Sequence, residues 1–337
     1  MKRFEREGLL GEGGLSMVWR ARDTETGDVV ALKTMKSNVA TPDLVARMKR
    51  EACVLASLEH PNCLRYHAHG LDARGLPYLA TELLAGRDLR DSLVAPVPVR
   101  QALALMEQLL TALEHIHAKG VVHRDVKPEN IVLIRGPNGS ERVVLIDFGL
   151  ALIEGSAVLA DGHRTSLGLV MGTPGAMSPE QILAQPVDAR ADLYCAGTVF
   201  YQLLTACCPF PETSPEAILA LQLRGEAVPL PPHVPPCLKR LVKRLMAPDP
   251  VLRPACAGEA RRALRCVEDA VSPGRRATWI DLLGPRSPAG GALPARTLPR
   301  RDSSRRVPHS SSTKGTRRPS TLRMQRRAST PSARGSS

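Results

Sequence analysis

The segment HRDVKPEN, residues 123–130, gathers an acid, a lysine and an asparagine in one short loop. It is flanked by the apolar residues Val121-Val122 and by the apolar run 131–134, so its polar side chains stand beside strands that should be buried. Asp, Asn and Pro also build ordinary turns, and this segment alone leaves that reading open. If the loop is part of an active site, it brings a carboxylate and a cationic side chain close together there.

The residues after this loop predict a β-hairpin that brings a second acid to it. Two apolar runs, 131–134 and 143–146, enclose an Asn-Gly turn signal. Pairing the last residue of the first run with the first residue of the second places Asn130 opposite Asp147. Directly opposed residues have Cβ atoms about 4.5–5.5 Å apart. We therefore expect an amide oxygen and a carboxylate to meet here, in an arrangement that suits a hard cation such as Mg²⁺.

A glycine-rich turn near the N-terminus predicts a place where backbone could approach a phosphate. The stretch GEGGLSMVWRA, residues 11–21, lies between apolar runs and predicts a strand, a turn and a second strand. Gly11, Gly13 and Gly14 would let backbone N–H groups come close to a ligand. A tight hairpin without a ligand explains these glycines equally well. The stretch is not a P-loop, because no Gly-Lys-Ser/Thr follows.

Two charged residues downstream of this turn are expected to pair. Lys33 shares a strand face with the small Ala31, which leaves room for a flat ligand beside a cation. Apolar residues at helical spacing predict a helix over 44–58, with Glu51 at the edge of its buried face. An unpaired buried charge is costly, so Glu51 needs a partner unless its side chain extends to water. Lys33 is the candidate partner. A second amphipathic helix is predicted over 99–118.

The charge of the chain is concentrated in its last part. Residues 271–337 carry 15 Lys/Arg and 2 Asp/Glu, which leaves 31 residues of each sign in the rest of the chain. This Ser-, Pro- and Arg-rich tail, placed at 269–337, has too few apolar residues to form a core and is expected to be disordered. Eight scattered cysteines without CxxC spacing predict reduced thiols. No apolar run could span a membrane and no secretory signal is evident, so we expect a cytoplasmic protein.

The ordered set of motifs resembles the eukaryotic-type (Hanks-type) protein kinase family, and most of all its bacterial serine/threonine kinases. The resemblance covers about residues 4–268 and includes, in order, GEGGLSMV (11–18), Lys33, Glu51, HRDVKPEN (123–130), Asp147-Phe148-Gly149, GTPGAMSPE (172–180), DLYCAG (192–197) and DPVLRP (249–254). It implies an α+β fold of two lobes. The smaller lobe, 1–84, would hold an antiparallel sheet and one main helix, and the larger lobe, 85–268, would be mainly helical.

The resemblance also implies ATP and Mg²⁺ or Mn²⁺ as cofactors, and Ser or Thr of protein substrates as acceptors. It assigns Asp125 to accept the proton of the substrate hydroxyl, Lys127 to neutralise the transferring phosphoryl group, and Lys33, positioned by Glu51, to hold phosphates. Asn130 and Asp147 would bind the metal. The implied ATP site, with its adenine-binding hinge at 82–84, consists of Leu10, Gly11, Glu12, Gly13, Gly14, Ser16, Val18, Ala31, Lys33, Thr81, Glu82, Leu84 and Leu133.

Further residues match supporting positions of the family. Arg124 would receive a phosphate placed on Thr165 or Ser166 of the activation segment, and an ion pair of Glu180 with Arg253 would be structural. Asp192 would brace the catalytic loop.

Competing hypotheses are a pseudokinase scaffold, a kinase for small molecules and a nucleic-acid-binding protein that uses the basic tail. The intact set Lys33, Asp125, Asn130 and Asp147 argues against the first, and the GTPGAMSPE segment argues against the second. The third has no recognisable reading fold or interleaved aromatic residues in its favour. The physiological substrate, the activating signal, the role of the tail and the oligomeric state stay open.

Overall fold

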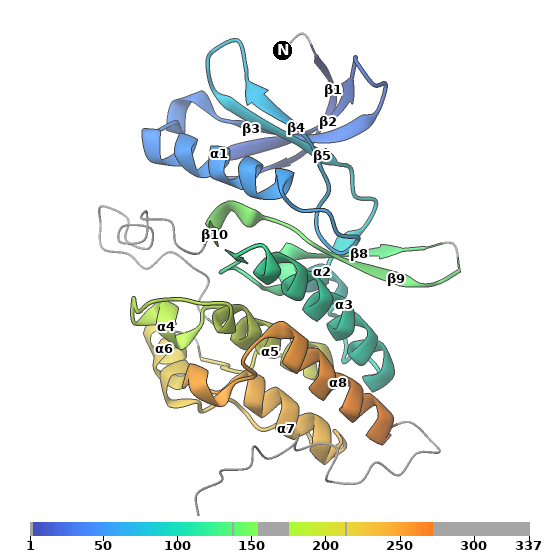
Figure 1. Ribbon diagram of the computed structural model, residues 1–337, viewed down its shortest axis with the longest axis vertical. Helices are drawn as coiled ribbons and strands as arrows, with labels where there is room; N and C mark the ends of the chain where they lie inside the picture. Colours follow the sequence, from blue (N-terminus) through green and yellow to red (C-terminus); the bar gives the residue numbers. More distant parts are fainter. Residues whose placement is uncertain (1–2, 137, 154–174, 213, 272–337) are drawn as a thin grey trace, which may run out of the picture. The chain divides into compact units, whose positions relative to one another are not determined.

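Figure 1 presents the computed structural model of the chain, which describes residues 3–136, 138–153, 175–212 and 214–271. Residue contacts divide the chain into two units, Met1–Arg286 and Ser287–Ser337, and the second lies outside the described residues. Thr165 and Ser166 of the expected activation segment and the basic tail from 272 onward also lie outside them. The predictions for these segments therefore stay predictions.

The N-terminal part of the first unit is a five-stranded antiparallel sheet in the order β1-β2-β3-β5-β4. Its strands are β1 (Phe4–Glu12), β2 (Ser16–Asp23), β3 (Val29–Met35), β4 (Tyr66–Leu71) and β5 (Pro77–Glu82). The glycine-rich turn joins β1 to β2, so the predicted strand, turn and strand are confirmed. Alternation along β3 buries Val30 and Leu32 in a small cluster with Phe4 and Ala21.

Helix α1 (Pro42–Ala56), which follows the short 3-10 turn η1 (Ser37–Val39), packs against β4 and β5. Thr41 caps its start by accepting a hydrogen bond from the N–H of Leu44, and a proline occupies the first helical position. Met48 and Leu55 lie on its buried face. The helix predicted over 44–58 is confirmed, with both ends about two residues earlier.

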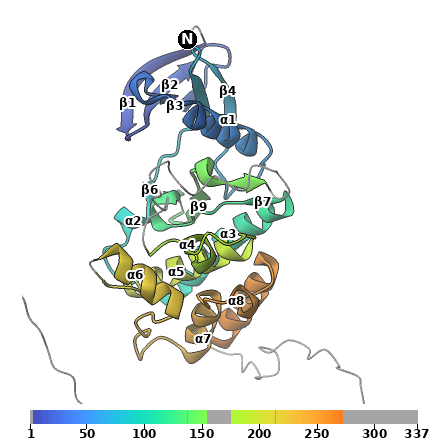
Figure 2. The same ribbon diagram turned by 90° about the vertical axis from the view of Figure 1, so that its left-hand side faces the viewer.

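The remainder of the first unit is mainly helical (Figures 1 and 2). Its helices are α2 (Leu89–Ser92), α3 (Val99–Ala118), α4 (Pro179–Ile182), α5 (Arg190–Thr205), α6 (Pro215–Arg224), α7 (Pro236–Leu245) and α8 (Ala257–Val271). Helix α3 has the predicted bounds and packs on α5 and α8, while α7 and α8 lie side by side (Figure 2). Fourteen of the 16 residues of α5 are buried, which makes it the central helix of the large hydrophobic core.

Short strands lie between the sheet and these helices and carry the polar loop. They are β6 (Arg87–Asp88), β7 (Val121–Val122), β8 (Ile131–Arg135), β9 (Glu141–Leu145) and β10 (Leu152–Ile153). Three 3-10 turns complete the described elements: η2 (Pro128–Asn130), η3 (Phe148–Leu150) and η4 (Pro250–Leu252). The loop 123–130 thus runs from β7 through η2 to β8, between strands that are largely buried.

The β8–β9 hairpin forms as predicted, but the predicted register is wrong by one residue. Ile134 pairs with Arg142 rather than with Val143, and Ile131 pairs with Leu145. Asn130 consequently lies beside Ile146, whose N–H donates to the Asn130 carbonyl at 2.9 Å, and not directly opposite Asp147. The strands extend further toward the turn than the apolar runs do, as far as the pair Arg135 and Glu141.

The two-lobed α+β fold expected from the resemblance is confirmed by the sheet and the helical remainder. No disulfide joins any of the eight cysteines, all of which lie in the described part of the chain. In the described part of the chain, no helix is both long enough and apolar enough to cross a membrane.

Candidate active site

A lysine on β3 and a glutamate on α1 form the first part of the site. Lys33 Nζ lies 2.8 Å from Glu51 Oε1 and 2.9 Å from Oε2, and the Glu51 side chain is only 6% exposed. Lys33 Nζ is also 3.9 Å from Asp147 Oδ1. Burial by itself would lower the pKa of Lys33, but the carboxylates of Glu51 and Asp147 outweigh it and raise that pKa. The predicted pairing of Lys33 with Glu51 is confirmed, and its ammonium group stays charged at neutral pH.

Asp147 follows β9 by two residues and has an uncommon backbone conformation. Its φ of 60° and ψ of 75° lie in the left-handed region, which the surrounding structure must hold in place. Its Oδ1 accepts a hydrogen bond from the Gly149 N–H at 3.2 Å. Burial tends to raise the pKa of Asp147, but Lys33 and the Gly149 N–H lower it overall. The side chain is 42% exposed, so a charged carboxylate is accessible beside Lys33.

Asp125 is the centre of the loop 123–130. Both of its carboxylate oxygens accept hydrogen bonds from Lys127 Nζ at 2.9 Å. Asn130 Nδ2 donates to the backbone oxygen and to Oδ2 of Asp125, each at 2.8 Å. The structure therefore brings three predicted residues together, and it uses the amide nitrogen of Asn130 while its amide oxygen remains an acceptor or ligand.

A buried aspartate on α5 holds the backbone of this loop. Asp192 accepts the N–H groups of His123 and Arg124, both at 2.8 Å, and His117 Nε2 lies 2.8 Å from its Oδ2. Burial would raise the pKa of Asp192, but its contacts with His117 and His123 lower it. The bracing contact expected for Asp192 is thus present. The sequence analysis did not predict the contribution of His117, although this residue lies four residues after the buried Leu113 and so on the same face of the helix.

Arg124 has a conformation and a hydrogen-bonding state that differ from those of an ordinary surface arginine. Its φ is 68°, in the left-handed region, and its carbonyl accepts a hydrogen bond from Gln181 Nε2 at 2.8 Å. The residue is buried, and its Nε has no hydrogen-bond partner among the described residues. Burial lowers the pKa of Arg124. A buried guanidinium with a free donor is suited to bind an anion.

Arg47 is a contact residue that the sequence analysis did not single out. It lies one turn before Glu51 on α1, so both side chains project from one face of the helix. Its Nε donates to the backbone oxygen of Gly149 at 2.9 Å, which ties α1 to the segment that follows Asp147. The spacing of four residues from Glu51 was the available signal.

The residues expected to form the ATP site fall on the strands of the sheet and on β8. The end of β1 contributes Leu10, Gly11 and Glu12, the turn contributes Gly13 and Gly14, and the start of β2 contributes Ser16 and Val18. Strand β3 carries Ala31 and Lys33, and β5 ends with Thr81 and Glu82. The last two residues are Leu84, which follows β5, and Leu133, which lies on β8. An added Cβ at Gly11 or Gly14 would meet no atom within 4 Å, so protein packing does not require glycine there. Leu10 is 50% exposed, and Val18 and Leu133 are only partly buried. Apolar side chains that the protein covers only in part, beside a glycine-rich turn with open space at Gly11 and Gly14, offer a surface on which a ligand can bind.

These features are those of a phosphate-transfer site on a two-lobed fold, and comparison with known proteins gives the family. Residues 4–264 match the protein kinase domain family, and the chain belongs to it.

Individual relatives match most of this chain but less of their own length. Serine/threonine-protein kinase pkn3 of Myxococcus xanthus is 36% identical over 277 residues, which are 79% of this chain and 50% of pkn3. Serine/threonine-protein kinase Pkn1 of the same species is 36% identical over 263 residues, 76% of this chain and 37% of Pkn1. Serine/threonine-protein kinase PknA of Mycobacterium tuberculosis is 32% identical over 280 residues, 81% of this chain and 63% of PknA. The chain thus spans 37% to 63% of the length of these relatives.

Proposed function

We propose that this protein is a serine/threonine protein kinase that transfers the γ-phosphate of ATP to hydroxyl groups of protein substrates, itself included. The observation that carries the proposal is the position of Lys33, bound to the buried Glu51 and 3.9 Å from the part-exposed Asp147. A fixed ammonium group beside an accessible carboxylate suits a polyphosphate and the cation that accompanies it.

In this proposal, the loop 123–130 acts on the substrate hydroxyl. Asp125 orients the hydroxyl and accepts its proton while the oxygen attacks the γ-phosphorus. The bond from the γ-phosphorus to the bridging oxygen breaks, and ADP leaves with that oxygen. Lys127, whose Nζ is 2.9 Å from the Asp125 carboxylate, neutralises negative charge on the phosphoryl group during transfer.

Asn130 and Asp147 are the residues that would hold Mg²⁺ or Mn²⁺. The donor set fits, because Asp147 offers an accessible carboxylate and Asn130 has committed only its amide nitrogen to Asp125. Amide and carboxylate oxygens suit hard cations of this kind. When bound, the metal neutralises phosphate charge. The residues of the chain orient the groups around it.

Adenine is assigned to the end of β5 and the residues that follow it. The backbone of Glu82 and Leu84 binds the base, Thr81 lies at the rear of the pocket, and Leu10, Val18, Ala31 and Leu133 form its apolar walls. The partial exposure of these apolar side chains supports the assignment. It also puts the boundary of the two proposed lobes, 1–84 and 85–268, within the adenine site.

The preference for Ser and Thr over Tyr is inferred from Lys127 in the pattern Asp-x-Lys-Pro-Glu-Asn. The names of the relatives pkn3, Pkn1 and PknA agree with it.

Incubation with γ-labelled ATP and Mg²⁺ tests the proposal. We expect label on Ser or Thr of the protein itself and of a general protein substrate. Lys33→Met and Asp147→Asn should each lower the initial rate by orders of magnitude, whereas the exposed changes Lys243→Met and Asp43→Asn should not. All four variants should keep the far-ultraviolet circular dichroism of the parent. Undiminished labelling in Lys33→Met or Asp147→Asn would overturn the assignment.

For the basic tail we propose self-modification rather than nucleic-acid binding. It contains several places where two arginines closely precede a hydroxyl residue, among them Arg275-Arg276-Ala277-Thr278, Arg317-Arg318-Pro319-Ser320 and Arg326-Arg327-Ala328-Ser329. Phosphate there would reduce the local positive charge. Deleting 271–337 should leave transfer activity intact, and mass spectrometry of the ATP-treated full chain should find phosphate on the tail. An unmodified tail that binds DNA or RNA in a salt-dependent way would favour the nucleic-acid alternative.

A further inference from the structure

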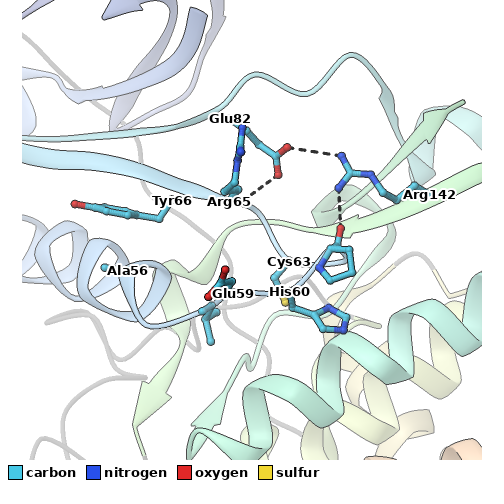
Figure 3. A pocket seen from close by; sticks show the side chains of 10 residues that line it. Ala56, Glu59, His60, Cys63, Arg65, Tyr66, Glu82 and Arg142 are labelled. Carbon is cyan, nitrogen blue, oxygen red and sulfur yellow. Dashed lines mark hydrogen bonds and ion pairs between the residues drawn. The ribbon is translucent and has the colours of Figure 1, made fainter. Parts of the chain in front are cut away.

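A cavity of about 740 Å³ adjoins the end of β5 and is lined by residues of the α1–β4 connection, β4 and β9 (Figure 3). Of the residues assigned to ATP, Glu82 alone lines it. Glu82 therefore has two environments: its backbone belongs to the proposed adenine-binding segment, and its side chain lines the cavity. The polar contacts of that side chain carry the inference.

The Glu82 carboxylate links β5 to Arg65, the residue before β4, and to β9. Its Oε1 accepts the N–H of Arg65 at 3.0 Å, and the N–H of Glu82 itself donates to the Arg65 carbonyl at 2.9 Å. Its Oε2 lies 3.7 Å from Arg142 Nη2. The Glu82 side chain is only 15% exposed, so each of these contacts restrains the backbone where β5 ends.

Arg142 joins this carboxylate to a further segment. Its Nη1 donates to the backbone oxygen of Pro61, in the α1–β4 connection, at 2.7 Å (Figure 3). Arg142 lies on β9, five residues before Asp147. The guanidinium group of Arg142 therefore contacts both the end of β5 and the α1–β4 connection. Arg142 itself belongs to β9, the strand that leads to the proposed metal ligand Asp147.

We propose that Arg142 is a positioning residue for ATP: through Glu82 it holds the backbone at the end of β5 in the conformation that binds adenine. The inference rests on the proposed function, because it assumes that adenine binds this backbone. Arg142 does not touch the nucleotide. Its effect is to hold in place, before ATP binds, the backbone segment that contacts the adenine. A site that is already ordered loses less conformational entropy on binding and so has a higher affinity for its ligand.

The alternative is that Arg142 and Glu82 form an ordinary surface ion pair with no effect on the binding of ATP. Arg135 and Glu141 supply the comparison, since they form a pair at 3.5 Å on the same hairpin, and the Arg135 side chain is 83% exposed. Such pairs contribute little. Arg142 differs in being 40% exposed and in donating, besides its ion pair with Glu82, a hydrogen bond to the backbone carbonyl of Pro61.

The experiment is a steady-state analysis of Arg142→Ala, Arg142→Lys and Arg135→Ala in the full chain. We expect Arg142→Ala to raise the KM for ATP about fivefold, equivalent to about 1 kcal/mol, with kcat and the KM for the protein substrate within about twofold of the parent. Arg142→Lys should be intermediate, because an ammonium group cannot reach both acceptors as the guanidinium fork does. Arg135→Ala should leave all three constants unchanged.

The base of the nucleotide provides a second readout that a merely structural role would not move. Purine riboside 5′-triphosphate lacks the exocyclic amine of adenine, so it forms fewer hydrogen bonds with the backbone near Glu82. The penalty of Arg142→Ala should therefore be smaller for this nucleotide than for ATP. Glu82→Gln should reproduce the effect of Arg142→Ala, and the double variant should be no worse than either single one.

Equal ATP KM values for Arg142→Ala and Arg135→Ala would overturn the inference and leave the kinase assignment standing. So would a fall in kcat with no specific effect on ATP, which would indicate general damage. Failure of the parent protein to transfer phosphate would overturn the proposed function and, with it, this inference. If Arg142→Ala does not fold, Arg142→Lys and Glu82→Gln decide by the same comparison.

Discussion

The ion pair between Glu180 on α4 and Arg253 after η4 is buried in the helical part, and breaking it should destabilise the fold. Arg253 Nη1 and Nη2 lie 2.7 Å and 2.8 Å from the two oxygens of Glu180. The same guanidinium group donates to the carbonyls of Ala247, Pro248 and Arg190 at 2.8–2.9 Å. The Arg253 side chain is 0% exposed, so water cannot replace these five hydrogen bonds.

Removing one partner should therefore cost much more than a surface pair does. Arg253→Met leaves a buried carboxylate and three carbonyls without this donor, and we expect a loss of about 3–5 kcal/mol in the free energy of unfolding. Glu180→Gln keeps the guanidinium on its carbonyl acceptors and should cost about 1–3 kcal/mol. The double variant should be less destabilised than the sum of the two, because no buried charge is left unpaired.

Urea unfolding followed by circular dichroism measures these losses as shifts of the midpoint at a constant slope. Arg135→Met is the control and should cost less than about 0.5 kcal/mol, since the Arg135 side chain is 83% exposed. Two results would refute this reasoning. One is a loss below about 1 kcal/mol in the free energy of unfolding for Arg253→Met, and the other is strict additivity in the double variant. Either would show that the buried ion pair does not stabilise the fold in the way described.

Three further predictions concern activity. Glu51→Gln should lower kcat/KM about tenfold to a hundredfold, because the ammonium group of Lys33 loses the carboxylate that fixes it; a rate within twofold of the parent would contradict this. Arg124, whose buried Nε has no hydrogen-bond partner among the described residues, should bind a phosphate on Thr165 or Ser166. Replacing both hydroxyl residues by Ala should therefore lower the activity of the ATP-treated protein, and phosphopeptide mapping checks the sites. Chelation of divalent cations should stop transfer and added Mg²⁺ or Mn²⁺ should restore it; full activity in the chelator would exclude the proposed metal site.

Local patterns predicted the elements that position the site. Apolar residues at helical spacing predicted α1 and α3, and the buried position of Glu51 on α1 led to its pairing with Lys33. The loop 123–130 was recognisable because charged residues between apolar runs have few structural explanations. Where spacing along one element determines which face a residue occupies, sequence alone was sufficient.

Register and cross-chain contacts were less predictable. The runs 131–134 and 143–146 are continuously apolar and carry no alternation, so they could not indicate which residue of one strand opposes which of the other. The turn decided it: the Gly136 N–H bonds to the Ser140 carbonyl at 2.8 Å and Arg135 pairs with Glu141. One residue of slip separates the predicted from the observed pairing.

Side chains that act between distant elements were missed for a related reason. Arg47, His117 and Arg142 each form a hydrogen bond or ion pair with a residue more than 50 positions away. Each lies on a helix or strand whose apolar pattern is explained without that contact. Only the packing of the elements in space makes such side chains recognisable.

The central claim, that phosphate is transferred at the loop 123–130, is tested most directly by one comparison. The parent protein and Asp125→Asn are each incubated with γ-labelled ATP and Mg²⁺ and a protein substrate, and the labelled amino acids are identified after acid hydrolysis. The account predicts phosphoserine or phosphothreonine from the parent and a rate lower by orders of magnitude from Asp125→Asn, with ATP affinity retained, because the carboxamide cannot accept the proton of the hydroxyl. Equal labelling by the two proteins, or label on tyrosine alone, would contradict it.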